Sequence, residues 1–286
     1  MFLEGIKIQN LKSNPKYILL NKGFVLYHLN KYDKAIKAYD KPIEINPQDS
    51  YAWDGKGLAL IQLNKYNEAI KAFDKAIETN SQNSMIWYNK GNVLYNQTKF
   101  DEAIKAYDKA IEINPQDPIA WESKGFALDK LNRSDEAIKA FKKYLNSSFS
   151  ESASDNIGYQ YYVKKDYQEA IKWYKTSIET NPLFLLPYCF ISNSYRMIND
   201  LNHTKYYQDI LIGEIENSSL THRSFNQGTW YFHTGSNDRA LLDSMNQTKY
   251  YAYYDVALTY YLKEDNNQTK KYVNLAKDLN IDENSQ

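Results

Sequence analysis

The chain has 286 residues, and its 35 basic and 35 acidic side chains give a formal charge of zero. A balanced charge argues against a nucleic-acid or anionic-membrane surface, because both partners favour a basic excess. The single cysteine, Cys189, excludes an intrachain disulfide. The longest apolar run, 183–191, is interrupted by Pro187 and is shorter than the roughly 20 residues of a membrane span. Since residues 1–15 also lack a secretory signal pattern, we expect a cytoplasmic protein.

One sequence unit recurs at a fixed period along the first half of the chain. Trp53, Trp87 and Trp121 stand 34 residues apart. The glycines and alanines that share this period are Gly23, Gly57, Gly91 and Gly125, and Ala35, Ala69, Ala103 and Ala137. Repetition at a fixed period predicts that each unit is one supersecondary element stacked on the next.

Residues 84–117 show the unit most clearly. Apolar residues recur there at helical offsets of three, four and seven, first before and then after the polar break 96–98. This pattern predicts two helices, the second closed by Asn114-Pro115, since proline cannot continue the hydrogen-bond ladder. A glycine inside a helix costs about 1 kcal/mol relative to alanine, so Gly91 indicates a close helix contact. One helix pair buries too little to stand alone, and the repeats must therefore stack.

The spacing of six residues in this repeat resembles the tetratricopeptide repeat. The matching residues are Trp87, Gly91, Ala103, Tyr107, Ala110 and Pro115. The resemblance implies an all-α fold, a right-handed α-solenoid of stacked antiparallel helix pairs in a superhelix. It also implies that the first helices of the pairs line a concave groove and that the protein binds other proteins.

In chain order, residues 1–15 resemble the end of a second helix, with Phe2, Ile6 and Ile8 ahead of Asn14-Pro15, and are predicted to cap the first repeat. Five well-matched repeats then fill 16–182. Their predicted bounds are 16–49, 50–83, 84–117, 118–150 and 151–184. The pattern weakens over 185–286, where about three degenerate helical hairpins are expected.

Two irregularities are visible in the sequence. Pro42 stands inside the second helix of the first repeat, where it removes a hydrogen bond to Ala38 and costs about 3 kcal/mol. We expect a kink or an early loosening of the helix after residue 38. The glycine of the fifth repeat, Gly158, comes one position earlier than the period set by Gly125 requires. A one-residue slip in the period explains this better than a hinge.

The resemblance assigns the second, fifth, ninth and twelfth residues of each repeat to the groove. The candidate groove residues are Tyr17, Phe24, Tyr27, Tyr51, Asp54, Leu58, Tyr88, Asn92, Tyr95, Glu122, Phe126, Asp129, Asp155, Tyr159 and Tyr162. Tyrosine suits such a surface because it combines apolar area with a hydroxyl group, although each ring could instead pack against the next repeat. The acidic side chains among these residues favour a basic peptide or protein partner. Some members of the family use Lys and Arg to bind the C-terminal carboxylate of a partner, and the corresponding positions here contain neither residue.

No catalytic, cofactor or metal site is expected. The four histidines form no metal-binding pair, and the glycines fall in helices rather than in a phosphate-binding loop. The sequence therefore predicts a non-enzymatic protein-interaction scaffold without nucleic-acid, membrane or cofactor partners. Two alternatives remain: a self-assembling repeat array, and an enzyme whose site includes His222 and His233 within 183–286.

Overall fold

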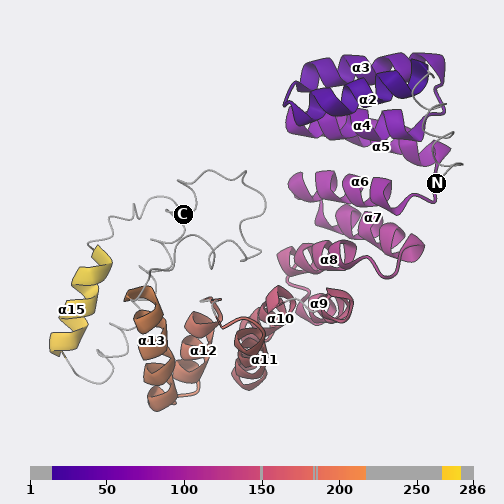
Figure 1. Cartoon of the computed structure of the whole chain (residues 1–286). Coiled ribbons are helices and arrows are strands. Elements are labelled where there is room, and N and C mark those ends of the chain that lie inside the picture. The colour runs from indigo at the N-terminus through magenta and orange to yellow at the C-terminus, as the bar shows by residue number, and fades with distance from the viewer. Residues whose placement is uncertain (1–14, 149–150, 183, 185, 217–265, 278–286) are drawn as a thin grey trace, which may run out of the picture. The chain divides into compact units, whose positions relative to one another are not determined.

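The computed structural model describes residues 15–148, 151–182, 184, 186–216 and 266–277 (Figure 1). The chain divides into two compact bodies, residues 1–133 and residues 134–286, which we call the N-terminal and the C-terminal body. Residues 1–14 of the cap expected at 1–15, residues 217–265 of the region of expected degenerate hairpins, and His222 and His233 lie outside the described residues.

The described residues form helices and no strand, which confirms the all-α class. The N-terminal body contains α2 (Pro15–His28), α3 (Tyr32–Ile45), α4 (Ser50–Gln62), α5 (Tyr66–Thr79), α6 (Ser84–Asn96), α7 (Phe100–Ile113) and α8 (Pro118–Lys130). The C-terminal body contains α9 (Ser134–Ser148), α10 (Glu151–Val163), α11 (Tyr167–Thr180), α12 (Leu186–Met197), α13 (Leu201–Glu216) and α15 (Asn266–Lys277).

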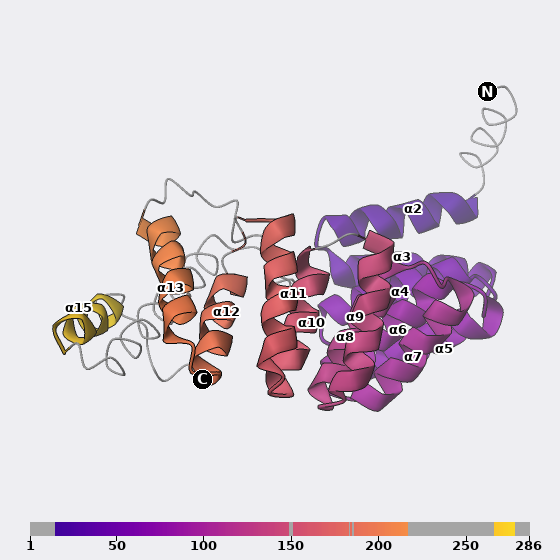
Figure 2. The same ribbon diagram turned by 90° about the horizontal axis from the view of Figure 1, so that it is seen from below.

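Within each body the helices pack in tandem pairs. From α2 to α8, and from α9 to α13, each helix packs against the next one in the chain. The first helices of successive pairs also touch, α2 with α4, α4 with α6, α6 with α8 and α10 with α12. Figures 1 and 2 show α12 and α13 side by side in two perpendicular views. Each body is therefore a segment of α-solenoid.

The two helices of each pair are joined by a tight turn that contains a residue with positive φ. In the second pair, Lys65 N–H bonds the Leu60 carbonyl at 3.0 Å and Asn64 N–H bonds the Ile61 carbonyl at 2.8 Å, which is the Schellman arrangement. The positive-φ residues are Asn30, Asn64, Thr98, Asn132, Lys165 and Asn199. They recur with the period of the repeat, except that Lys165 comes one position early, so the turns show the same slip as the sequence.

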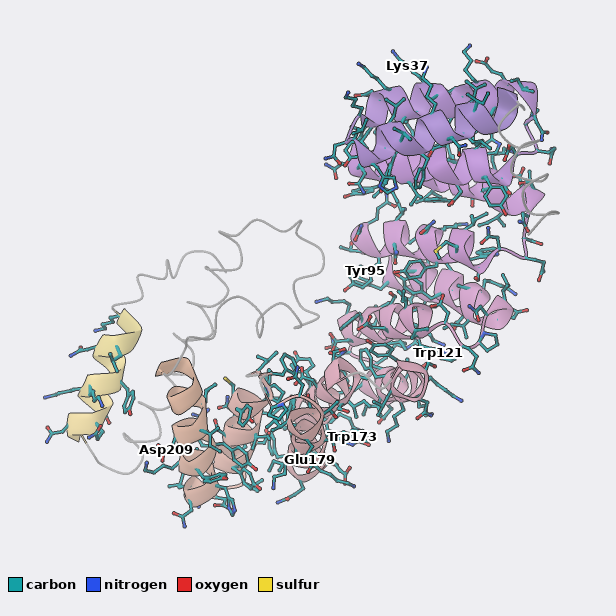
Figure 3. The ribbon with its side chains drawn as sticks, viewed as in Figure 1. Lys37, Tyr95, Trp121, Trp173, Glu179 and Asp209 are labelled. Atoms are coloured by element: carbon teal, nitrogen blue, oxygen red, sulfur yellow. The ribbon has the colours of Figure 1, made fainter. Side chains whose placement is uncertain are left out.

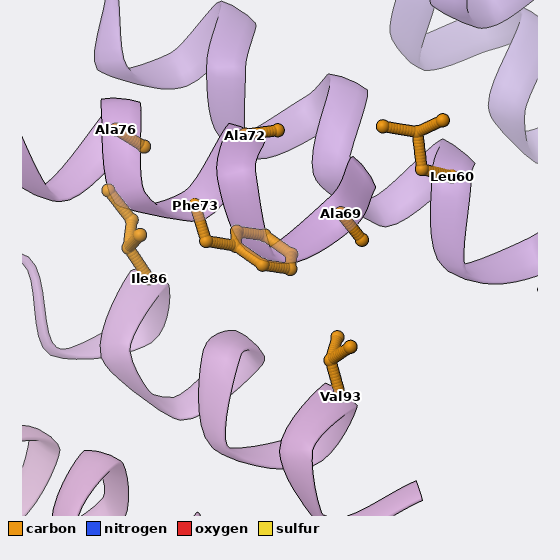
Figure 4. Packing of buried hydrophobic residues seen from close by; sticks show 7 residues of the cluster. All are labelled: Leu60, Ala69, Ala72, Phe73, Ala76, Ile86 and Val93. Carbon is orange, nitrogen blue, oxygen red and sulfur yellow. The ribbon is translucent and has the colours of Figure 1, made fainter. Parts of the chain in front are cut away.

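Gly23, Gly57, Gly91 and Gly158 of the first helices lie against aromatic rings, which confirms the close helix contact predicted at Gly91. A Cβ atom at Gly91 would lie 2.5 Å from Cε1 of Tyr107, and one at Gly57 would lie 2.6 Å from Cε1 of Phe73. Phe73 lies between α5 and α6 in the core of the N-terminal body (Figure 4). These contacts explain why a larger residue is excluded despite the helical cost of glycine.

A second contact joins each pair to the next on the N-terminal body. Lys90 Nζ on α6 lies 2.6 Å from Asp74 Oδ1 on α5 and 5.6 Å from the centre of the Trp87 ring. Trp87 Nε1 also donates to the Ser81 carbonyl at 3.0 Å, in the loop between the pairs. The same arrangement recurs one repeat earlier, around Trp53, and one repeat later, around Trp121. Trp121 is labelled in Figure 3.

The expected early loosening of the helix at Pro42 is wrong. Helix α3 continues to Ile45 and thus ends at the same place in its repeat as α5 and α7. Pro42 is buried together with Ala35, Ala38 and Tyr39. Because most helical stability in proteins comes from packing of the apolar face, this burial holds the helix across the missing backbone hydrogen bond.

Candidate functional site

The first helices of the N-terminal body carry most of the predicted groove residues. Twelve of the fifteen lie on α2, α4, α6 and α8, and three lie on α10 of the C-terminal body. The side chain of Tyr17 lies outside the described part of the chain. We use the name first-helix face for the four groove positions on each of α4, α6 and α8. These residues are Tyr51, Asp54, Leu58, Ile61, Met85, Tyr88, Asn92, Tyr95, Ile119, Glu122, Phe126 and Asp129.

A row of exposed apolar side chains begins this face. Tyr51, Met85 and Ile119 hold the same position on three neighbouring helices and are 67, 53 and 52% exposed. Single apolar residues on a surface are ordinary, but exposed apolar residues at one position of successive helices that touch one another mark a candidate binding surface. Acidic residues lie beside this row. Asp54 follows Tyr51 by three positions on α4, and Glu122 follows Ile119 by three positions on α8.

A hydrogen bond between neighbouring first helices orders the middle of the face. Asn89 Nδ2 on α6 donates to Asp54 Oδ1 on α4 at 3.0 Å. Burial raises the pKa of Asp54 above its ordinary value, and the bond from Asn89 lowers it in part. Asn89 is not among the candidate groove residues, because it stands one position beyond the groove position of Tyr88; its burial and its bond to Asp54 reveal its role.

Tyr107 reaches this face from the second helix α7. Its hydroxyl donates to Asn92 Oδ1 at 2.8 Å, and its ring lies 6.0 Å from the ring of Tyr88. Burial is the main cause that raises the pKa of the Tyr107 hydroxyl. Tyr88 and Asn92 therefore contact a buried core residue, and these two half-buried side chains form the floor of the face.

The far end of the face is aromatic and acidic. The Tyr95 ring packs edge-on against Phe100 with centroids 5.2 Å apart and lies at the end of the helices where the pairs turn (Figure 3). Burial raises the pKa of Tyr95, and the nearby charge of Asp129 raises it further. Tyr95 and Asp129, from α6 and α8, are thus brought together by the structure.

The remaining predicted residues of this body lie in different surroundings. Phe24 on α2 is exposed and packs edge-on against His28 at 4.3 Å. The Tyr27 hydroxyl accepts a bond of 3.4 Å from Gln62 Nε2 on α4, and burial raises its pKa. Leu58 packs against the buried core, so it supports the face from beneath.

The three predicted residues on α10 lie in a packed aromatic cluster. Tyr159 and Tyr162 lie 5.8 and 5.7 Å from the Phe190 ring of α12, and Phe190 stacks on the buried Tyr174. Asp155 is 4% exposed, and burial raises its pKa to about 7. Its Oδ1 atom has no hydrogen-bond partner, so this carboxyl group is shielded from solvent rather than presented on an open surface.

Metal ligands do not cluster in the described part of the chain, which contains no group of three or more His, Cys, Asp and Glu side chains that could hold a metal ion. None of the described helices is both long enough and apolar enough to cross a membrane.

Two family models, both described as tetratricopeptide repeat, match the chain. One matches residues 17–49 and the other matches 55–118 and 88–157. These matches cover the first four helix pairs and part of α10. The sequence matches none of the curated proteins with which it was compared.

Solved structures share the fold. The crystal structure of YrrB, described as a TPR protein with an unusual peptide-binding site, is 25% identical, covers 63% of this chain and 92% of its own, and has a TM-score of 0.52. The crystal structure of MamA protein is 24% identical over 58% of this chain and 92% of its own, with a TM-score of 0.55. The C-terminal part of a TPR repeat-containing protein from Cytophaga hutchinsonii is 16% identical over 92% of this chain and 100% of its own, with a TM-score of 0.70.

Proposed function

The chain belongs to the tetratricopeptide-repeat family, and we propose that it is a non-enzymatic scaffold whose first-helix face binds a polypeptide segment. The observation that carries the proposal is the exposed row of Tyr51, Met85 and Ile119 beside the hydrogen-bonded pair Asn89 and Asp54. Aromatic and large apolar side chains are frequent energetic anchors at interfaces. YrrB, a TPR protein with an unusual peptide-binding site and a similar fold, adds support.

The spacing of the helices suits an extended ligand. Neighbouring packed helices lie about 10 Å apart, and an extended segment advances about 3.3 Å for each residue. About three ligand residues therefore span one step of the array, and a segment of about seven residues would reach over the two steps from α4 across α6 to α8. Met85 would meet the middle of such a segment.

The charges of the face favour a basic ligand. Asp54, Glu122 and Asp129 lie on it, and none of its twelve positions is Lys or Arg. Charge complementarity guides partner choice and association rate more than it adds affinity.

We also propose a cytoplasmic location, since the single cysteine requires no oxidising compartment.

A peptide selection tests the proposal. The full chain is used to select binders from a random library of short peptides, and the selected sequences are expected to combine Lys or Arg with apolar residues. Affinity should fall as salt rises, because exposed charges are screened. A control chain carries Lys71→Ala and Lys105→Ala, at exposed positions of the second helices α5 and α7. It should bind the selected peptides as tightly as the native chain does. Selection of acidic peptides, or equal binding at all salt concentrations, would remove the electrostatic part of the proposal.

A further inference from the structure

A buried carboxyl group and a buried tyrosine hydroxyl lie close together in the C-terminal body. Asp155 on α10 is 4% exposed, and Tyr174 on α11 is fully buried. Burial, and next the charge of Asp155, raises the pKa of the Tyr174 hydroxyl, so the two groups lie within electrostatic reach of each other. Among the described residues, neither Asp155 Oδ1 nor the Tyr174 hydroxyl has a hydrogen-bond partner. Because a buried polar atom without a partner costs free energy, both atoms would gain from a ligand.

The equivalent tyrosine of the third repeat has a partner. Tyr107 holds the position of Tyr174, and its hydroxyl donates to Asn92 Oδ1 at 2.8 Å. In the fifth repeat Tyr159 stands at the position of Asn92, and Asp155 precedes it by four positions. The fifth repeat thus exchanges an amide acceptor for a ring and adds a carboxyl group. The stacking of the helices does not require an unpartnered hydroxyl at this place.

Aromatic rings border the two unpartnered atoms. Phe190 on α12 stacks on the Tyr174 ring with centroids 5.3 Å apart, and it lies 5.8 and 5.7 Å from the rings of Tyr159 and Tyr162. The last two tyrosines also act on the Tyr174 hydroxyl and raise its pKa. Their rings and that of Phe190 are half-buried, so solvent reaches this part of the site. We call Asp155, Tyr159, Tyr162, Tyr174 and Phe190 the Asp155 cluster.

We propose that the Asp155 cluster binds an alkylammonium group, such as that of a lysine side chain. The ammonium group donates hydrogen bonds to Asp155 Oδ1 and to the Tyr174 hydroxyl, and its charge is attracted to the faces of the aromatic rings. A guanidinium group fits less well, because it favours the two oxygens of one carboxylate, whereas the two acceptors here belong to different side chains.

The half-buried rings of Tyr159 and Tyr162 give the ligand its way in. Rotation of partly exposed side chains is fast, so these rings turn to admit the ligand to the buried carboxyl group. The site uses no residue of the first-helix face.

The charge of Asp155 controls the binding. Burial raises the pKa of Asp155 to about 7, whereas an alkylammonium group stays charged up to about pH 10. The tyrosines of the cluster are neutral in this range, and Phe190 from α12 does not ionise. Helix α9 contacts α10 through Tyr144, whose hydroxyl lies 3.3 Å from Ser152 Oγ and is neutral as well. Because the ionised fraction of Asp155 rises from about one tenth at pH 6 to about nine tenths at pH 8, affinity should rise about tenfold.

NMR titration of the full chain tests the proposal. The ammonium probes are n-butylammonium and acetyl-lysine methylamide, and the guanidinium probe is acetyl-arginine methylamide. Dissociation constants are measured at pH 6 and pH 8 for the native chain, for Asp155→Asn and for Glu179→Gln. Glu179 is an exposed acidic residue of α11 (Figure 3) and is the matched control for loss of one carboxylate. Asp155→Asn preserves the size of the side chain, and thermal unfolding checks that each variant is folded.

We expect both ammonium probes to bind the native chain about tenfold more tightly at pH 8 than at pH 6. At pH 8 the Asp155→Asn chain should bind them at least about tenfold more weakly than the native chain does, and the Glu179→Gln chain should bind them equally tightly. Tighter binding of the lysine derivative would identify a polypeptide as the source of the group, and tighter binding of butylammonium would identify a free amine; either result supports the site.

Three results would overturn the proposal. The first is no binding of either ammonium probe, or equal affinity at the two pH values. The second is unchanged affinity of the Asp155→Asn chain. The third is tighter binding of the arginine derivative than of the lysine derivative, since that result contradicts the preference for an ammonium group.

Discussion

Asn89 on α6 donates a hydrogen bond from Nδ2 to Oδ1 of Asp54 on α4, over 3.0 Å. The bond joins the first helices of two neighbouring repeats directly, without an intervening second helix. It holds a carboxyl group whose pKa is raised by burial at the floor of the first-helix face. The same bond thus contributes both to the stacking of the repeats and to the charge of the proposed binding surface.

Replacing Asn89 by alanine should destabilise the N-terminal body and raise the pKa of Asp54 further. A buried carboxylate that loses a donor costs about 1 to 3 kcal/mol at neutral pH. Because the lost bond favoured the ionised form of Asp54, this cost should shrink as the pH falls and Asp54 becomes protonated in both chains. Carboxyl-carbon NMR gives the pKa, and urea unfolding gives the stability. In an Asp54→Asn background the same replacement should cost clearly less, and an unchanged cost would contradict the account.

The C-terminal body should lose stability as the pH rises from about 4 to 7. Burial raises the pKa of Asp155 from its ordinary 3.8 to about 7, so within this window the unfolded chain ionises while the folded chain still holds its proton. Each pKa unit corresponds to about 1.4 kcal/mol, which makes the total on the order of 4 kcal/mol. Asp155→Asn should remove most of this pH dependence in urea unfolding followed at several pH values. An identical slope in that variant would exclude Asp155 as its source.

The same substitution at two glycines should have opposite effects on stability. A Cβ at Gly91 would lie 2.5 Å from the Tyr107 ring, whereas a Cβ at Gly213 would meet nothing within 4 Å. Gly91→Ala should therefore cost about 1 to 3 kcal/mol through overpacking. Gly213→Ala should stabilise α13 by up to about 1 kcal/mol through helix propensity. Thermal unfolding of both variants measures the difference, and a stabilising Gly91→Ala would refute the close contact.

The turn of the third repeat offers a stabilising substitution. Thr98 has a φ of 58°, where the equivalent residues are Asn30, Asn64 and Asn132. A left-handed conformation costs an ordinary residue roughly 1 to 2 kcal/mol and suits a branched one poorly, whereas asparagine adopts it more readily. Thr98→Asn should raise stability by about 1 kcal/mol, and the reverse change, Asn64→Thr, should lower it by a similar amount. Denaturant midpoints compare the two.

The repeat architecture was predictable because its signals are local. Gly91 and Tyr107 belong to one helix pair and lie close together in the sequence, so spacing alone brings them into contact. The sixth pair was harder to recognise, because Ser192 and Thr204 replace glycine and alanine. Both are fully buried, so small polar residues occupy the positions that glycine and alanine hold in the earlier repeats. The positive-φ turn residue Asn199 follows Lys165 by the usual 34 positions.

The surroundings of individual side chains were less predictable. Helix α3 continues through Pro42 because the proline is buried. Helix propensities describe single residues and do not include such burial. Asp155 occupies a groove position by count, yet its burial depends on how the C-terminal body packs around α10. Asn89 acquires its role only because α4 and α6 are neighbours. For Asn89 the decisive contact, with Asp54, thus comes from another repeat.

Affinity measured against the exposed row tests the central claim most directly. A chain carrying Tyr51→Ala, Met85→Ala and Ile119→Ala loses three side chains that are more than half exposed, so its unfolding should change little. Calorimetry with a peptide selected on the native chain should show at least about a hundredfold weaker binding, since interface anchors often contribute about 1 to 2 kcal/mol or more each. The account predicts this loss at unchanged thermal stability. Equal affinity for the variant and the native chain would contradict it.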